Sequence, residues 1–374
     1  MKIGLLSLYY KNYNMGGLLQ AYALQKVIQK FGCQVEQVSF DYLRYYDNNQ
    51  NSQVNSPMKT VISSLRYVKR NWRFLHRLRS FSRFMNIIPH SEKIYSSIEE
   101  FAENYDRFIV GSDQVWGEWL PIEALKSYLL CSPIFDNKRH SYAASIGTDT
   151  ISSEFSELYQ KAFYSFNTIS VREESAKAEI KNLIQESDVS VHLDPTLLLT
   201  ADEWSTVAEQ TGHPDKYIFC YFLGKNSDYR KGVEKFAQKV SLPIVTLPFI
   251  KDNKIGDYDI NFGTIRDFKS GPTQFLHLIK NAEFIITDSF HAVVFSCLFH
   301  KKFYVLDRVD AGVRSTNNRI SDFLRTFELT SRYIAVDQLE FIDFNNAISY
   351  DSFEEKLSKL REESYSYLKS ISSL

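Results

Sequence analysis

The stretch from residue 283 to 299 constrains the fold of this chain more than any other. It begins with the apolar β-type run Phe284–Thr287, and Asp288 and Ser289 follow as two candidate helix N-caps. Apolar residues at helical spacing come next, so the stretch predicts a strand, a tight turn and a helix. In an open parallel sheet such a turn lies at the carboxyl ends of the strands, where crevices bind ligands.

His291 would lie in the first turn of that helix. The helix dipole disfavours a protonated imidazole there, so a charged His291 would need an anionic partner. The alternative is a packed histidine that hydrogen-bonds a carbonyl. Other strands of this chain also end in polar clusters, and this favours a functional role for His291.

Length and composition limit the class of protein. A chain of 374 residues exceeds what one hydrophobic core usually serves, so two domains are expected. The net charge of −1 gives no general attraction to nucleic acid. The four cysteines form no CxxC pair, which favours reduced core residues of a cytoplasmic protein. We expect no metal, and no apolar stretch is long enough to span a bilayer.

The amino-terminal region predicts a strand–helix–strand unit. Residues 3–8 form an apolar run, and a helical pattern ends at Gly32 before a second strand at 34–40. Gly16 and Gly17 are expected in the connecting loop, where glycine allows close backbone approach or positive φ. Without the GxGxxG spacing, ligand contact and simple turn chemistry are equal alternatives.

Several later strands end in polar residues of the kind that hydrogen-bond or stack on sugars. Because the carboxyl ends of parallel strands share one edge, such residues indicate a site. These residues are Ser112, Asp113, Gln114 and Trp116 after one strand, Arg172 and Glu173 after another, and Asp194 before Pro195 after a third.

The alternation of strands and helices restarts after residue 200 and predicts an α/β protein with two Rossmann-like domains facing a cleft, the GT-B layout. We expect an acceptor-side domain at 1–200, a donor-side domain at 201–340 and a helical tail at 341–374 that packs back on the first domain. A loop rich in arginine and asparagine precedes the last helix of the second domain.

A basic helical insertion is expected at 59–84. Its apolar stripe includes Trp72 and alternates with basic residues, among them Arg70, Arg73 and Arg77. The default interpretation is a solvated helix face. The competing hypothesis is peripheral docking on anionic membrane at its inner face.

Five motifs, in order, resemble the polysaccharide pyruvyl transferase family. The resemblance spans roughly residues 1–335 and rests on residues 14–25, 111–116, 170–173, 194–195 and 289–292. It implies a GT-B-like fold and transfer of the pyruvyl group of phosphoenolpyruvate to a hexose as a cyclic ketal, in the synthesis of capsule or other exopolysaccharide. The acceptor can be lipid-linked, and no cofactor is implied.

The resemblance also implies roles for individual residues. The family's histidine motif reads Arg-Leu-His, whereas this chain has Ser289-Phe290-His291, so Arg314 or Arg319 is the candidate replacement for the missing arginine. His291 would act as proton donor, and Asp113 or Glu173 as the base that receives the acceptor's hydroxyl proton. The implied substrate-binding residues are Arg172, Ser289, Arg314, Arg319, Gly16, Gly17, Gln20, Ser112, Gln114 and Trp116.

Structural alternatives exist for several of these residues. Arg172 and Glu173 could form a local ion pair, and Asp113 could cap a turn. Two other functions also fit a GT-B fold: a nucleotide-sugar glycosyltransferase and a non-catalytic saccharide-binding module of a capsule assembly complex. The acceptor sugar and the oligomeric state stay open.

Overall fold

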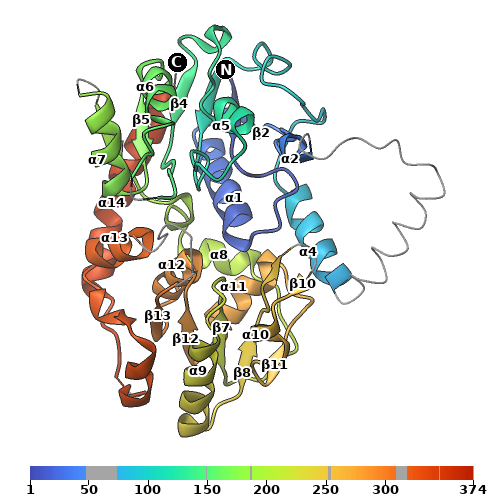
Figure 1. The fold of residues 1–374 in the computed structure, drawn as a ribbon, viewed down its shortest axis with the longest axis vertical. Coiled ribbons are helices and arrows are strands. Elements are labelled where there is room, and N and C mark those ends of the chain that lie inside the picture. The colour runs from blue at the N-terminus through green and yellow to red at the C-terminus, as the bar shows by residue number, and fades with distance from the viewer. Residues whose placement is uncertain are drawn as a thin grey trace, which may run out of the picture. The chain divides into compact units, whose positions relative to one another are not determined.

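The computed structural model describes residues 1–47, 74–148, 150–185, 188–251, 254–308, 318–344 and 346–373. The chain divides into two compact units, each with its own parallel sheet (Figure 1). Unit 1 comprises Met1–Ser52, Met85–Leu199 and Glu355–Leu374, and unit 2 comprises Gln53–Phe84 and Thr200–Glu354. Only residues 74–84 of the first segment of unit 2 are described.

The sheet of unit 1 has the strand order β2-β1-β3-β4, and isolated parallel bridges continue it to the pair β5-β6. The chain leaves β1 toward β2 on one side and enters β3 on the other, so the topological switch point lies between β1 and β3. The elements of unit 1 are β1 (Lys2–Leu6), α1 (Met15–Lys30), β2 (Gln34–Gln37), α2 (Arg44–Asp47), β3 (Arg107–Val110), α5 (Ile122–Tyr128), β4 (Arg139–Ser141), α6 (Ser156–Tyr164), β5 (Ile169–Val171), α7 (Glu174–Leu183) and β6 (Val189–Val191), with 3₁₀ turns at Pro133–Phe135 and Pro195–Leu197.

Helix α1 begins earlier than the sequence predicts. Asn14 is its N-cap, and the Asn14 side chain accepts a hydrogen bond from the Gly17 N–H at 3.0 Å. Gly16 and Gly17 therefore belong to the first helical turn, and the prediction that they form a loop is wrong. The close approach expected of glycine is real at Gly17, because a Cβ there would overlap the Asn12 side chain.

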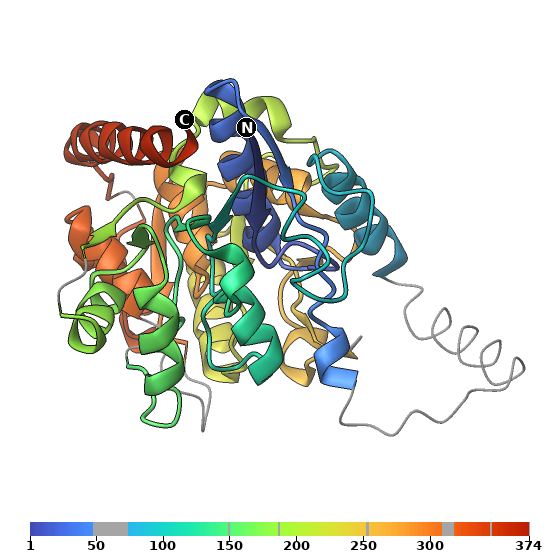
Figure 2. The ribbon, with the colours of Figure 1, turned by 90° about the horizontal axis from the view of Figure 1, so that it is seen from above.

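The last helix, α14 (Asp351–Ser372), begins in unit 2 and ends in unit 1. Figure 2 shows it as one unbroken helix in dark red. The Tyr365 hydroxyl donates to the Leu198 carbonyl at 2.6 Å, and the Tyr367 hydroxyl donates to the Ser141 carbonyl at 2.9 Å. These bonds confirm the prediction that the terminal helix packs on the first half of the fold.

The sheet of unit 2 has six parallel strands in the order β11-β8-β7-β12-β13-β14. Numbered along the chain, this is the Rossmann order 3-2-1-4-5-6, whose switch point lies between β7 and β12. Unit 2 contains α4 (Leu75–Asn86, which ends in unit 1), α8 (Ala201–Val207), β7 (Ile218–Tyr221), α9 (Ser227–Val240), β8 (Ile244–Thr246), β9 (Ile250–Lys251), β10 (Lys254–Ile255), α10 (Asp257–Ile260), β11 (Ile265–Arg266), α11 (Pro272–Asn281), β12 (Phe284–Thr287), α12 (Phe290–Leu298), β13 (Phe303–Leu306), α13 (Asn318–Thr326) and β14 (Tyr333–Ile334), with 3₁₀ turns at Thr330–Arg332 and Val336–Phe341.

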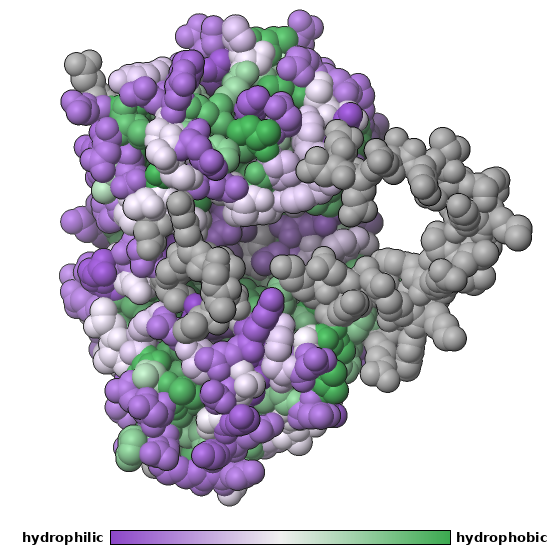
Figure 3. All heavy atoms as spheres, in the orientation of Figure 1, coloured by the Kyte–Doolittle hydropathy of each residue, from purple (hydrophilic) through white to green (hydrophobic). Residues whose placement is uncertain are grey.

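The strand, turn and helix predicted at 283–299 are β12 and α12, and both elements are wholly buried. Many of the chain's aromatic residues pack in the cores. In unit 1, for example, the rings of Phe108 and Phe135 meet edge to face with centroids 5.1 Å apart. On the face shown in Figure 3, hydrophilic side chains in purple surround smaller apolar patches in green. Among the described residues, no helix combines the length and apolar character needed to cross a membrane.

Candidate functional site

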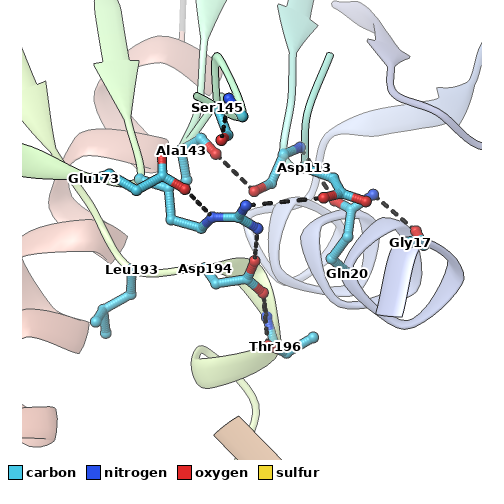
Figure 4. Close-up of polar contacts among 12 residues, drawn as sticks. Gly17, Gln20, Asp113, Ala143, Ser145, Glu173, Leu193, Asp194 and Thr196 are labelled. Atoms are coloured by element: carbon cyan, nitrogen blue, oxygen red, sulfur yellow. Dashed lines mark hydrogen bonds and ion pairs between the residues drawn. The ribbon is translucent and has the colours of Figure 1, made fainter. Parts of the chain in front are cut away.

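At the carboxyl edge of the unit 1 sheet, three carboxylates surround the guanidinium of Arg172. Arg172 follows β5, and its Nε donates to Glu173 Oε1 at 2.8 Å, while its Nη1 donates to Asp194 Oδ2 at 2.7 Å. Its Nη2 lies 3.8 Å from Asp113 Oδ1. Figure 4 shows Glu173, Asp113 and Asp194 converging on this one group from three directions. The structure thus brings together side chains from strand ends that are far apart in sequence.

The electrostatics of this cluster are unusual because one positive charge faces three negative charges. Burial by itself would lower the pKa of Arg172, but the charges of Glu173, Asp194 and Asp113 outweigh it and raise that pKa. With all four groups ionised, the cluster carries a formal charge of −2. Substrate binding by Arg172 stays a prediction. The contacts in this structure give Arg172 a second task, which is to hold the carboxylates in place.

Two of the three carboxylates are buried and the third is accessible. Exposure of the side chain is 4% for Glu173, 0% for Asp194 and 14% for Asp113. Glu173 Oε2 is buried, and the described residues offer it no hydrogen-bond partner. A buried oxygen without a hydrogen-bond partner is rare in proteins. Glu173 Oε2 is therefore an acceptor that a proton or a ligand could use.

Sequence analysis named Asp194 among the polar residues at strand ends and in a family motif, but gave it no individual role. Its Oδ1 accepts from both the backbone N–H and the hydroxyl of Thr196, at 3.0 and 2.6 Å, while Oδ2 binds Arg172. Its position after β6 and before Pro195 was the available signal, because it puts Asp194 on the same sheet edge as Arg172.

The loop that carries Asp113 is anchored to α1. Ser112 N donates to Gln20 Oε1 at 3.1 Å, Gln20 Nε2 donates to the Gly17 carbonyl at 2.8 Å, and the Ser112 hydroxyl donates to the Ala143 carbonyl at 2.6 Å. Gln20 and Ser112 are both fully buried. Their bonds position Asp113, whereas the sequence analysis expected both residues to contact substrate directly.

Trp116 does not offer a stacking surface, which corrects the expectation for this residue. Its side chain is fully buried, its Nε1 donates to the Tyr128 carbonyl at 3.2 Å, and the ring of Phe163 packs edge-on at 5.0 Å. The neighbouring Gln114 is half-buried, and a Cβ at Gly147 would lie 3.1 Å from its Cδ. Trp116 is therefore a core residue of unit 1.

A second group of polar residues lies at the switch point of unit 2. Asp288 Oδ1 accepts from Leu223 N and its Oδ2 from Gly224 N, both at 2.7 Å. Asp288 thus ties the end of β12 to the turn after β7 and does not cap α12. Ser289 occupies the N-cap position of α12, but its side chain makes no capping bond.

Arg308, after β13, completes this group. Its Nη2 donates to the Asp288 carbonyl at 3.0 Å, and its Nε lies 3.9 Å from Asp288 Oδ2. A Cβ at Gly224 would lie 2.8 Å from Asp288 Oδ2 and 3.0 Å from Arg308 Cγ, so only glycine allows this approach. Burial raises the pKa of Asp288, and the charge of Arg308 together with the two N–H donors opposes that rise.

The turn after β7 is fixed from its other side by Arg230. The buried Arg230 donates from Nη2 to the Gly224 carbonyl at 3.0 Å and from Nη1 to the Asn226 carbonyl at 2.8 Å. Its Nε binds Asp259 at 2.7 Å, and the guanidinium lies 4.6 Å from the centroid of the Tyr258 ring. Sequence analysis had no signal for the ion pair, because Asp259 lies 29 residues from Arg230 in sequence.

His291 lies in the first turn of α12, as predicted, and only 7% of it is exposed. The rings of Phe290 and His291 meet at 86° with centroids 5.2 Å apart. Arg319 is half-buried in α13, and Arg314 lies outside the described residues. His291 therefore shares the carboxyl edge of the unit 2 sheet with Asp288, Ser289 and Arg308.

The basic segment at 59–84 is described only from residue 74, so Trp72, Arg70 and Arg73 lie outside the described residues. Arg77 is buried, and its guanidinium donates to the carbonyls of Pro248 and Asp267. It cannot belong to a membrane-facing surface, which corrects its assignment to that surface. Docking on membrane stays a prediction.

Within the described parts of the chain, no group of three or more histidine, cysteine and acidic side chains is placed to hold a metal ion. The two groups of residues, each considered within its own unit, are suited to different chemistry. Carboxylates at the unit 1 edge can accept protons, while N–H groups and arginine at the unit 2 edge can bind anions.

Known structures share this architecture. MnaA of S. aureus, solved with UDP, aligns with a TM-score of 0.54 at 13% identity over 99% of this chain and 94% of MnaA. The UDP-GlcNAc 2-epimerase of Methanocaldococcus jannaschii aligns with a TM-score of 0.51 at 12% identity over 98% of this chain and 100% of the epimerase. These likenesses show a GT-B fold. No curated protein matches the sequence. The sequence model described as polysaccharide pyruvyl transferase matches residues 14–310, and the chain therefore belongs to the polysaccharide pyruvyl transferase family.

Proposed function

We propose that this protein transfers the pyruvyl group of phosphoenolpyruvate to a hexose of a surface polysaccharide precursor, forming a cyclic ketal and releasing phosphate. Family membership supports the transferase class. The observation that carries the proposal is the Arg172 cluster, which holds two candidate bases, Asp113 and Glu173, at a sheet edge. A capsule or exopolysaccharide precursor, free or lipid-linked, would be the acceptor.

The reaction needs proton transfers that these residues can perform. Protonation of C3 makes C2 of the enol electrophilic, and a sugar hydroxyl then attacks C2 as it loses its proton. The bond between C2 and the phosphate oxygen breaks, and a second hydroxyl closes the ketal. Of the two protons lost by the sugar, one ends on C3 and the other on phosphate. Asp113 is suited to accept the hydroxyl proton because it is the accessible carboxylate of the cluster.

The donor carries about three negative charges when its phosphate is fully ionised, so it requires cationic groups and N–H donors. The unit 2 edge supplies the guanidinium of Arg308 and the amino end of α12. At that end the Ser289 side chain makes no capping hydrogen bond. Arg308 is thus a third candidate for the arginine that the Ser289-Phe290-His291 motif lacks. His291, in the same helical turn, is the candidate proton donor.

The test is phosphate release from phosphoenolpyruvate in the presence of galactosides, mannosides or lipid-linked sugars. His291→Asn should slow release by roughly 10²–10⁴-fold, because asparagine cannot act as the acid. The melting temperature should change little, because the asparagine side chain fills much of the space of the imidazole. The matched control is His300→Asn, an exposed histidine just beyond the same helix that pairs with Glu354. It should keep full activity.

Other outcomes would point to the alternatives. Turnover of a UDP-sugar without phosphate release would identify a glycosyltransferase, and binding of phosphoenolpyruvate or saccharide without turnover would identify a binding module. If the His291→Asn variant is strongly destabilised but its folded fraction keeps activity, His291 is a packed structural residue and not the acid.

A further inference from the structure

Three exposed aromatic residues belong to the segments that follow β1, β2 and β3 of the unit 1 sheet. Tyr13 is 53% exposed, Tyr46 is 42% exposed and Trp119 is 49% exposed. Tyr13 lies in the loop from β1 to α1, and Trp119 lies in the loop that follows β3. These two loops follow β1 and β3, the strands on either side of the switch point, and open α/β sheets bind ligands at such a point.

The loop that carries Trp119 is held by specific contacts. A Cβ at Gly117 would overlap the indole ring, so glycine lets that ring lie against its own backbone. The Tyr46 hydroxyl donates to the Trp119 carbonyl at 3.3 Å. The adjacent Glu118 accepts a 2.6 Å hydrogen bond from Ser152 N. An exposed aromatic ring on an anchored loop loses little conformational freedom when a ligand packs on it.

Trp119 and Asp113 lie in the same loop after β3. Backbone hydrogen bonds fix this loop, from Val115 N to the Asp113 carbonyl at 2.8 Å and from Gly117 N to the Gln114 carbonyl at 3.2 Å. A Cβ at Gly17 would lie 3.4 Å from Asp113 Oδ2. The Asp113 carboxylate therefore lies beside the first turn of α1, and Tyr13 lies just before that turn.

We propose that Trp119, flanked by Tyr13 and Tyr46, is the platform on which the acceptor sugar stacks so that its hydroxyls face Asp113. This inference rests on the proposed function and names the acceptor subsite of that site. An indole face packs against the C–H face of a pyranose, while tyrosine hydroxyls and a carboxylate bind the sugar's hydroxyl groups. Trp116, three residues earlier, has the same chemistry but is inaccessible.

The experiment compares wild type, Trp119→Ala and Trp119→Phe in the phosphate-release assay with a soluble galactoside or mannoside. Trp119→Ala should raise the KM for the saccharide about ten- to hundredfold, and Trp119→Phe should raise it less. The Kd for phosphoenolpyruvate should stay unchanged. The matched control is Tyr164→Ala, a 59% exposed tyrosine at the end of α6, which lies at the opposite edge of the sheet.

A direct binding measurement separates failure of the platform from failure of the proposed reaction. Saccharide binding, followed by calorimetry, should weaken in Trp119→Ala and persist in Tyr164→Ala whether or not phosphate is released. Wild-type saccharide binding without phosphate release would contradict the proposed pyruvyl transfer but not the proposed binding platform. Equal saccharide affinity, or equal KM, in wild type and Trp119→Ala would overturn the platform.

Discussion

Both units place polar side chains at the carboxyl edge of their sheet, but the two groups differ in their balance of charge. At the unit 1 edge, three carboxylates share the single guanidinium of Arg172. At the unit 2 edge, the carboxylate of Asp288 faces Arg308 and two backbone N–H donors, beside the amino end of α12. In the unit 1 cluster the carboxylates therefore outnumber the cation, whereas Asp288 in unit 2 is matched by one arginine.

This difference shows how one architecture can serve two chemical tasks. A carboxylate among other carboxylates binds a proton more readily, which suits a base that activates a sugar hydroxyl. Backbone N–H groups and arginine suit an anionic donor instead. The fold sets the position of both edges, but the side chains decide which ligand each edge can bind. The contrast supports an acceptor role for unit 1 and a donor role for unit 2.

The largest expected effect comes from removing the charge that holds the unit 1 cluster together. Arg172→Met leaves Glu173 and Asp194 buried without a counter-charge and should destabilise the protein by about 3–5 kcal/mol. Protonation removes the uncompensated charge of such carboxylates, so the deficit should be largest at neutral pH and shrink in acid. Urea unfolding at pH 7 and pH 5 measures both effects. A deficit independent of pH would mean that packing, not charge, is lost.

Arg172→Lys is the matched control for that change. Lysine keeps the charge but lacks the planar guanidinium that donates to two carboxylates at once. The loss of stability should therefore be smaller, about 1.5–3 kcal/mol. If Arg172 also binds the donor, the same variant should lose roughly ten- to hundredfold in donor affinity. Unchanged donor affinity would leave Arg172 with the positioning task alone.

Acid should weaken unit 1 before unit 2. Burial lowers the pKa of both His140 and His192 to about 4, and both lie in unit 1. Because these folded-state values are below the ordinary 6.5, their contribution is complete above pH 6.5 and is lost as pH falls toward 4. Each should cost on the order of 2 kcal/mol by pH 5.

Hydrogen exchange between pH 7 and 5 should therefore accelerate more in β4–β6 than in β7–β13. His192→Phe should reduce the acceleration, because phenylalanine can keep the stacking on Tyr367 at 4.4 Å without titrating. The control is His76→Phe, an exposed position on α4. Equal acceleration in both units would break the comparison.

Much of the fold could be predicted because the spacing of apolar residues and the residues that begin or end elements indicate the same boundaries. The buried run Phe284–Thr287 and the helical spacing after it gave β12 and α12, and Gly32, with a φ of 78°, ends the first helix region as expected. The same local rules misplaced the start of α1. Asn14 is a good cap, and the two glycines after it were given more weight than that cap.

The candidate site was less predictable, since its partners meet only in three dimensions. Pattern alone could not decide which indole, Trp116 or Trp119, faces the core, because both follow the same strand within a few residues. Asp194 appeared as a polar strand end and part of a motif without a role of its own, and Arg308 as one arginine of a loop. Their roles depend on contacts with Arg172 and Asp288 that no sequence spacing encodes.

The smallest expected effect separates a structural carboxylate in unit 2 from an accessible one in unit 1. Asp288→Asn replaces one acceptor oxygen by an amide nitrogen, so either Leu223 N or Gly224 N loses its acceptor, at a cost of about 1–3 kcal/mol. Asp113→Asn should cost less than about 0.5 kcal/mol, because its carboxylate reaches Arg172 only at 3.8 Å, yet it should slow phosphate release.

Ser289→Ala is the control for the Asp288 variant and should change stability by no more than about 0.5 kcal/mol, since the Ser289 side chain makes no capping bond. Urea unfolding without donor gives the stabilities, and the phosphate assay gives the rates. If Ser289→Ala costs as much as Asp288→Asn, the turn is held by an N-cap and not by the Asp288 bridge. If Asp113→Asn destabilises the protein while its rate is kept, the contrast between the two edges is structural and carries no division of catalytic roles.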